Sequence, residues 1–159
     1  KWFYLRSYAQ VYVLQGFFLF LIALPVFVIN RHVGPSLGWL DFVALSLWLF
    51  GFYFEVVGDA QLARFIKNPT NKGKIMQSGL WAYTRHPNYF GEVTVWWAIW
   101  LFTVLHVQGA WFTVIGPLTI TFLLLKVSGV PMLEKKMEAN PQFAEYKKKT
   151  SMFIPLPKK

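Results

Sequence analysis

The sequence contains no cysteine, and only seven of its 159 residues are acidic, against sixteen lysines and arginines. Without cysteine there is no disulfide framework, no thiolate nucleophile and no cysteine metal site. The three histidines, at positions 32, 86 and 106, do not stand at the spacing of metal ligands, so no metal site is predicted. A P-loop and a glycine-rich fingerprint following a strand are also missing, which argues against Walker and Rossmann nucleotide sites.

Apolar and aromatic residues dominate the composition. Hydrophobic residues make up 55% of the chain, aromatic residues 19%, and the mean hydropathy is +0.39. This composition is too apolar for an ordinary soluble domain and predicts a membrane protein whose first partner is the lipid bilayer. The net charge of +9 does not indicate nucleic-acid binding, because the cations gather at the ends of apolar runs.

Four apolar runs are long enough to cross a hydrocarbon core of about 30 Å, at about 1.5 Å per helical residue. They are residues 8–29, 38–57, 89–107 and 110–130, the second continuing as a helix to about residue 66. From Pro131 the chain is amphipathic, which predicts a short helix, a break at Asn140-Pro141 and a second helix at the membrane surface. We therefore predict an all-α fold for residues 1–159, a single multipass transmembrane helical bundle of four spans with a C-terminal amphipathic interfacial segment.

The positive charges also predict an orientation. Of the sixteen lysines and arginines, only Arg31 falls in the two turns predicted at 30–36 and 106–109. Because positive charge accumulates on the cytoplasmic side of a membrane, the central loop 64–88 and the C-terminus are expected in the cytoplasm.

The stretch Gly79–Glu92 packs cations, tyrosines, an amide and a carboxylate into a turn that leads into the third apolar run. Ionisable groups at the mouth of a span usually face a water-filled or ligand-filled cavity, so this stretch is the predicted functional site. Pro87 suits the first turn of a helix, and the backbone N–H groups of 88–90 would be free to meet an anion beside Arg85. The structural alternatives are an interfacial anchor and an ion pair between Glu92 and a nearby arginine.

The polar residues where the second and third runs meet the cytoplasm form a plausible set of cofactor contacts. Cations match phosphates, aromatic faces stack on a heterocycle, and carboxylates or amides hold ribose hydroxyls or a carboxamide. This inventory predicts a nucleotide-like cofactor. The residues concerned are Asp59, Arg64, Lys72, Lys74, Tyr83, Arg85, His86, Asn88, Tyr89 and Glu92.

Several segments resemble the bacterial DUF1295 branch of the steroid 5α-reductase superfamily. They are Glu55–Phe65, Asn71–Lys74 and Gly79–Glu92, with Lys126–Val130, Glu145-Tyr146 and Phe153–Pro155 in the C-terminal part. The resemblance implies a cytoplasm-facing pocket for NADPH in a bacterial inner-membrane protein. It also implies that a carbon–carbon double bond conjugated to a carbonyl, in a steroid-like or isoprenoid lipophilic substrate, is reduced deeper in the membrane.

Carried over by motif, the resemblance also assigns residues. The cofactor contacts that it implies are Asp59, Arg64, Lys72, Tyr83, Arg85, His86, Asn88, Tyr89 and Glu92. Tyr4, just ahead of Arg6, is the candidate catalytic tyrosine, and we expect a catalytic glutamate in spans upstream of Lys1. Glu55 stands where the steroid enzymes have an asparagine.

Two other functions remain open. The isoprenylcysteine carboxyl methyltransferases share the Arg-His-Pro-x-Tyr-x-Gly core that begins at Arg85 here, and they bind S-adenosylmethionine at the same place. Asn88 and Glu92 together, with Gly58-Asp59, are more typical of the reductases. A non-catalytic membrane subunit of a larger complex is the third hypothesis, and it predicts that the chain's own ion pairs fill the central motif. The sequence does not predict an oligomeric state.

Overall fold

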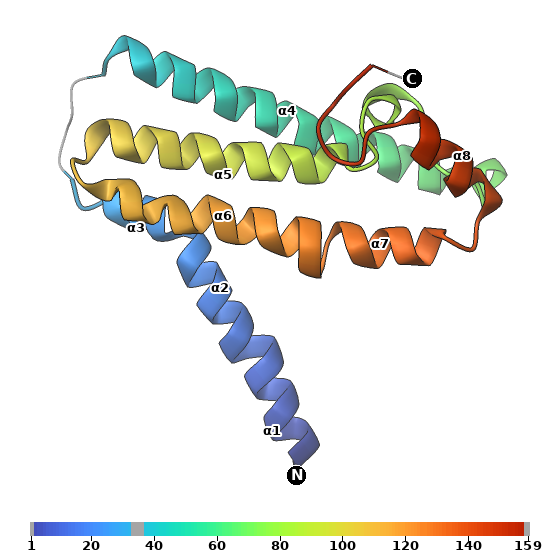
Figure 1. Ribbon diagram of the computed structural model, residues 1–159, viewed down its shortest axis with the longest axis horizontal. Coiled ribbons are helices and arrows are strands. Elements are labelled where there is room, and N and C mark those ends of the chain that lie inside the picture. Colours follow the sequence, from blue (N-terminus) through green and yellow to red (C-terminus); the bar gives the residue numbers. More distant parts are fainter. Residues whose placement is uncertain (1, 33–36, 158–159) are drawn as a thin grey trace.

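The computed structural model describes residues 2–32 and 37–157, and their regular structure is helical (Figure 1). The α-helices are α1 (Trp2–Tyr8), α2 (Leu14–Ile22), α3 (Leu24–Ile29), α4 (Trp39–Lys67), α5 (Pro87–His106), α6 (Ile115–Phe122), α7 (Val130–Met137) and α8 (Pro141–Lys149). A short π-helical turn at Ala9–Val13 joins α1 to α2, and a second one at Leu123–Val127 follows α6. Tight 3-10 turns lie at Pro69–Asn71, Gly79–Ala82 and Ala110–Val114. The predicted all-α fold is confirmed.

The predicted number of spans is wrong by one. Within the described residues, three helical stretches are long and apolar enough to cross a membrane: Trp2–Ile22, Trp39–Lys67 and Ala110–Met137. Helix α5 has 20 residues, but it begins with Pro87-Asn88 and carries Glu92 and three tryptophans, which lower its hydropathy. The first stretch ends at Ile22 rather than at residue 29, because the helix is interrupted at Ala23 and α3 begins at Leu24 with Pro25 in its first turn.

Helices α4 and α5 run antiparallel and form the main helix pair of the bundle (Figure 1). Glycines set how closely they approach. A Cβ atom placed on Gly51 would lie 2.8 Å from the carbonyl oxygen of Gly91, and one on Gly58 would lie 3.2 Å from the backbone nitrogen of Asn88. Small residues permit this contact between helices in a membrane, where little hydrophobic driving force exists between them. The polar start of α5 is thereby pressed against α4.

Helix α6 packs on the other side of α5 (Figure 1). The apolar core lies between α2, α5 and α6 and includes Ile22, Val93, Ile120 and Leu124. The indole Nε1 of Trp97 donates to the hydroxyl of Thr121 at 3.2 Å, which ties α5 to α6. By contrast, α1 projects away from the bundle and buries no residue.

The C-terminal segment folds back over the loop between α4 and α5. The predicted break at Asn140-Pro141 is confirmed, with the Asn140 side chain accepting from the Gln142 N–H at 3.0 Å to cap α8. The Asn140 amide also donates to the Gly73 carbonyl at 2.8 Å. Beyond α8, the Arg85 N–H donates to the Ser151 carbonyl at 2.9 Å. The loop that carries the predicted site is therefore held by α8 and by the tail.

Candidate functional site

Four polar residues meet across α4 and α5 at the end of the pair that adjoins the loop; we name Glu55, Asp59, Asn88 and Glu92 the carboxylate cluster. The Asn88 amide donates to the Asp59 carboxylate at 2.9 Å. Glu55 lies one helical turn from Asp59, and Glu92 one turn from Asn88, so each pair shares a helix face. The carboxylates of Glu55 and Asp59 are close enough to repel that of Glu92 electrostatically. The cluster thus offers acceptors and one amide on a single face.

Arg85 points to a different part of the fold. Its Nε atom lies 2.8 Å from Oε1 of Glu134 on α7, and its terminal N–H donates to the Thr150 carbonyl at 2.8 Å. The side chain is buried. Arg85 is therefore held within the protein through its Nε and one terminal nitrogen. Among the described residues, Glu92 forms no ion pair with an arginine.

His86 shares the same carboxylate. Its Nε2 lies 3.2 Å from Oε1 of Glu134, and its ring stacks on Tyr89 with 5.7 Å between centroids. Burial lowers the pKa of His86 below its ordinary value, although the Glu134 carboxylate acts in the opposite direction. Assigned from this hydrogen bond, the neutral ring carries its proton on Nε2 and leaves Nδ1 as an acceptor. Nδ1 is buried and has no hydrogen-bond partner within residues 2–32 and 37–157.

Glu134 is the residue of this region that the sequence did not predict. Its Oε1 accepts hydrogen bonds from Arg85 and His86, and the Lys147 ammonium lies 4.0 Å from its second oxygen. A signal was present, because Glu134 follows Leu133 and precedes Met137 by three residues, next to the apolar side of an amphipathic helix. The partner residues, however, lie far away in the sequence.

The remaining predicted residues are more exposed. Arg64 and Lys72 have exposed side chains near the loop. Tyr83 is 49% exposed, and its carbonyl accepts from the Leu156 N–H at 3.0 Å. Tyr4 is 77% exposed on the projecting helix α1, where its ring packs on Phe3, so the structure does not bring Tyr4 to the carboxylate cluster. Its catalytic role stays a prediction.

The start of α5 is covered more closely than the sequence predicts. Gly58 of α4 lies against the backbone nitrogen of Asn88. The indole Nε1 of Trp81 donates to the Gly58 carbonyl at 3.0 Å, and the Tyr146 hydroxyl donates to the Trp81 carbonyl at 2.5 Å. Burial raises the pKa of this tyrosine. An anion at the α5 N-terminus would have to share this space with α4.

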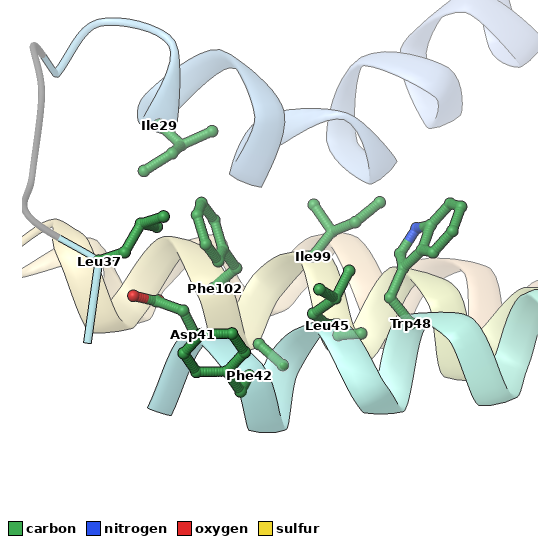
Figure 2. Close-up of a pocket in the computed structure, with 10 residues that line it drawn as sticks. Ile29, Leu37, Asp41, Phe42, Leu45, Trp48, Ile99 and Phe102 are labelled. Carbon is green, nitrogen blue, oxygen red and sulfur yellow. The ribbon is translucent and has the colours of Figure 1, made fainter. Parts of the chain in front are cut away.

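An apolar pocket of about 290 Å³ opens at the opposite end of the α4–α5 pair (Figure 2). It is lined by α4 and α5 with Ile29 of α3 and Leu37. At its end, Nε2 of His106 lies 2.6 Å from Oδ1 of Asp41, and both side chains are buried. We name this the outer pocket.

A family model described as protein of unknown function DUF1295 matches residues 1–150. The chain belongs to the DUF1295 family. It is also similar to the uncharacterized protein C594.04c of Schizosaccharomyces pombe, with 25% identity over 184 aligned residues that cover 98% of the chain. The alignment covers 51% of that protein, so the chain spans about half the length of the curated relative it matches. No solved structure matches the chain.

The DUF1295 match includes both polar groups described above, and in this chain they lie apart. Asp59, Asn88 and Glu92 are brought together across α4 and α5. Arg85 and His86 are brought together on Glu134. The three long apolar helices among the described residues make the chain an integral membrane protein. Its DUF1295 membership fits a steroid 5α-reductase-like membrane protein.

Proposed function

We propose that this DUF1295 protein is a membrane-embedded reductase that uses NADPH to reduce a carbon–carbon double bond conjugated to a carbonyl in a lipophilic substrate. The observation that carries the proposal is the carboxylate cluster. Asp59, Asn88 and Glu92 gather on one face of an apolar helix pair, beside a basic loop. Polar groups in such a position are costly unless they serve a ligand or a pathway.

The donors and acceptors of this region fit NADPH. The Asp59 carboxylate and the Asn88 amide suit ribose hydroxyls or a carboxamide, and the exposed cations Arg64 and Lys72 suit phosphates. Nδ1 of His86, which has no partner among the described residues, is a further acceptor, but it is buried, so a ligand would reach it only if the loop moved. Arg85 fits less well, because a phosphate would have to compete with Glu134 for it.

When bound, NADPH would supply a hydride to the β-carbon of the double bond, and the α-carbon would take a proton from water. The protein residues position the partners and shape the electrostatics. Glu92, with Tyr83 and Tyr89, would border the cofactor. Tyr4 remains the proposed donor to the substrate carbonyl, a role that requires the projecting helix α1 to meet the substrate. The cations near the loop support a cytoplasmic location of residues 64–88 and of the C-terminus, in an inner membrane if the protein is bacterial.

The decisive experiment is a titration of the purified protein in nanodiscs with NADPH, NADH and S-adenosylmethionine separately. We expect saturable NADPH binding that weakens about tenfold in Asn88→Ala and in Glu92→Gln, because each removes one polar contact. Glu145→Gln is the matched control, since Glu145 is exposed on α8 and pairs only with neighbouring lysines.

The other two hypotheses predict different results in the same titration. Tight S-adenosylmethionine binding with no NADPH binding would assign the protein to methyl transfer. If none of the three cofactors binds, the protein is better explained as a non-catalytic membrane subunit. If NADPH binds, a screen of lipophilic enones for substrate-dependent NADPH oxidation identifies the substrate.

A further inference from the structure

The carboxylate cluster and the outer pocket lie on one continuous face of the α4–α5 pair. On α4 the face consists of Asp41, Leu45, Trp48, Phe52, Glu55 and Asp59. On α5 it consists of His106, Phe102, Ile99, Val95, Glu92 and Asn88. In both helices the spacing alternates between four and three residues, which is the helical repeat, so each set forms one stripe along its helix.

The two stripes run side by side in antiparallel register, next to the close glycine contact of the two helices. Asp59 bonds to Asn88 at one end, at 2.9 Å, and Asp41 bonds to His106 at the other, at 2.6 Å. Between these two bonds, Leu45 and Trp48 of α4 line the same pocket as Ile99 and Phe102 of α5. The stripe is polar at its two ends and apolar in the middle, apart from Glu55 and Glu92.

The outer pocket occupies the half of this stripe that is far from the loop. Leu45 and Trp48 line it from α4, and Ile99 and Phe102 from α5. Figure 2 shows Leu37 and Asp41 at one end of the pocket and Trp48 at the other. The Trp48 and Phe52 rings stack, with 4.9 Å between centroids, and continue the apolar surface toward Glu55. Trp48 lies seven residues from Glu55, a distance of about 10 Å along the helix.

At the Asp41 end, the described residues that line the pocket are almost entirely apolar. Asp41 and Trp48 contribute the only side-chain polar atoms among the described residues that line it. One Asp41 oxygen accepts from His106, and the other accepts from the Gly38 N–H at 2.6 Å. A ligand with a polar group at this end would lose hydration and would meet only a buried carboxylate whose two oxygens each already accept a hydrogen bond. The pocket therefore favours hydrocarbon.

We infer that the outer pocket holds the hydrocarbon end of the substrate, so that the reacting carbonyl end lies toward Glu55 and Glu92. This inference rests on the proposed function. The substrate is then an elongated lipophile, polar at its reacting end and free of polar groups at the other. Asp41 lies fourteen residues from Glu55, which gives such a molecule about 20 Å along the stripe.

Photolabelling in nanodiscs tests the inference without NADPH. The probe is a long-chain enone with a diazirine near the end of its tail, and the paired probe has a hydroxyl at that end. We expect the apolar probe to label peptides from residues 41–48 and 99–106, competed by the unlabelled enone, and the hydroxylated probe to label them severalfold less. Equal labelling by both probes would overturn the assignment.

Two variants on one helix separate the pocket from the lipid-facing surface. Leu45→Trp fills the pocket and should reduce labelling severalfold. Leu49→Trp should not, because Leu49 is 53% exposed, close to the 51% of Leu45, but does not line the pocket. If both variants reduce labelling equally, the probe is reporting general exposure to lipid and the inference fails.

Other occupants give their own results. A photoreactive phospholipid that labels the pocket and resists competition by the enone would make it a lipid site. Peptides that resist every probe would mean that protein covers the pocket. The NADPH titration is independent: NADPH binding without tail labelling overturns only the pocket assignment, and saturable tail labelling without NADPH binding overturns the reductase.

Discussion

The Nε atom of Arg85 lies 2.8 Å from Oε1 of Glu134, although the two residues are 49 positions apart. His86 approaches the same oxygen at 3.2 Å. One carboxylate on α7 therefore fixes the orientation of two consecutive residues of the loop. Because Arg85 is engaged in this way, its substitution tests the fold as well as cofactor binding.

Removing the Glu134 carboxylate should strongly destabilise the protein. Glu134→Ala leaves the buried Arg85 guanidinium without its partner, and breaking a buried pair costs about 3–5 kcal/mol. The measurement is thermal unfolding in detergent, followed by the fluorescence of the tryptophans. Glu145→Ala is the control and should change stability by less than about 1 kcal/mol, because its ion pairs are exposed. Equal effects of the two substitutions would show that Glu134 does not hold the loop.

His86 should make stability depend on pH in the mildly acidic range. Its pKa in the folded protein is lowered by burial, so the unfolded chain takes up a proton first as the pH falls. The stabilisation is complete above the ordinary value of about 6.5 and is lost between that value and the lower folded pKa. Melting temperatures from pH 7.5 to 5 should therefore fall more steeply in wild type than in His86→Gln. The matched control is His32→Gln at an exposed position, and an unchanged slope in His86→Gln would contradict the prediction.

The Gly51 contact should not tolerate a methyl group. In Gly51→Ala, the new Cβ would lie 2.8 Å from the Gly91 carbonyl oxygen, so α4 and α5 must separate, at a cost of about 1–3 kcal/mol. The separation should also weaken NADPH binding, because the carboxylate cluster spans the two helices. Gly16→Ala is the control, since its Cβ meets nothing within 4 Å and alanine favours the helix by about 0.5–1 kcal/mol. A Gly51→Ala protein with wild-type stability and binding would refute the close packing.

The donor and the acceptor of the Asp59–Asn88 hydrogen bond should be interchangeable between the two positions. Asn88→Asp places two carboxylates side by side, and Asp59→Asn leaves two amides, so each should weaken NADPH binding by about tenfold, or about 1.4 kcal/mol. The double substitution Asp59→Asn/Asn88→Asp restores one donor and one acceptor and should recover part of the loss. Folding should change little, because Asp59 is exposed. Losses that simply add in the double variant would mean that the two residues act separately.

Local features of this fold were predictable from the sequence. Pro87 starts α5 and Asn140 caps α8, because each acts through its own backbone or its immediate neighbours. The shared faces of Glu55 with Asp59 and of Asn88 with Glu92 follow from helical spacing. The resemblance to DUF1295 proteins is confirmed by the family match over residues 1–150.

Long-range features were not predictable. Glu134 meets Arg85 only because α7 and α8 turn back over the loop, and no spacing rule covers that return. The pairing of His106 with Asp41, 65 residues apart, depends on the antiparallel register of α4 and α5. The number of spans was overestimated by counting residues 89–107 as one. The tryptophans of α5 pack as apolar side chains, but they add little to the mean hydropathy by which a membrane span is judged.

The bonds that hold the loop also imply an order of events in folding. Residues 69–86 leave the ribosome well before Asn140, Gln142 and Ser151, which bind this loop at Gly73, Ile75 and Arg85. Helices α4 and α5 adjoin in sequence and can pair early, since domains form progressively from the N-terminal side during synthesis. The loop beside the carboxylate cluster acquires its final conformation only after α8 and the tail have been synthesised, when α4 and α5 can already be paired.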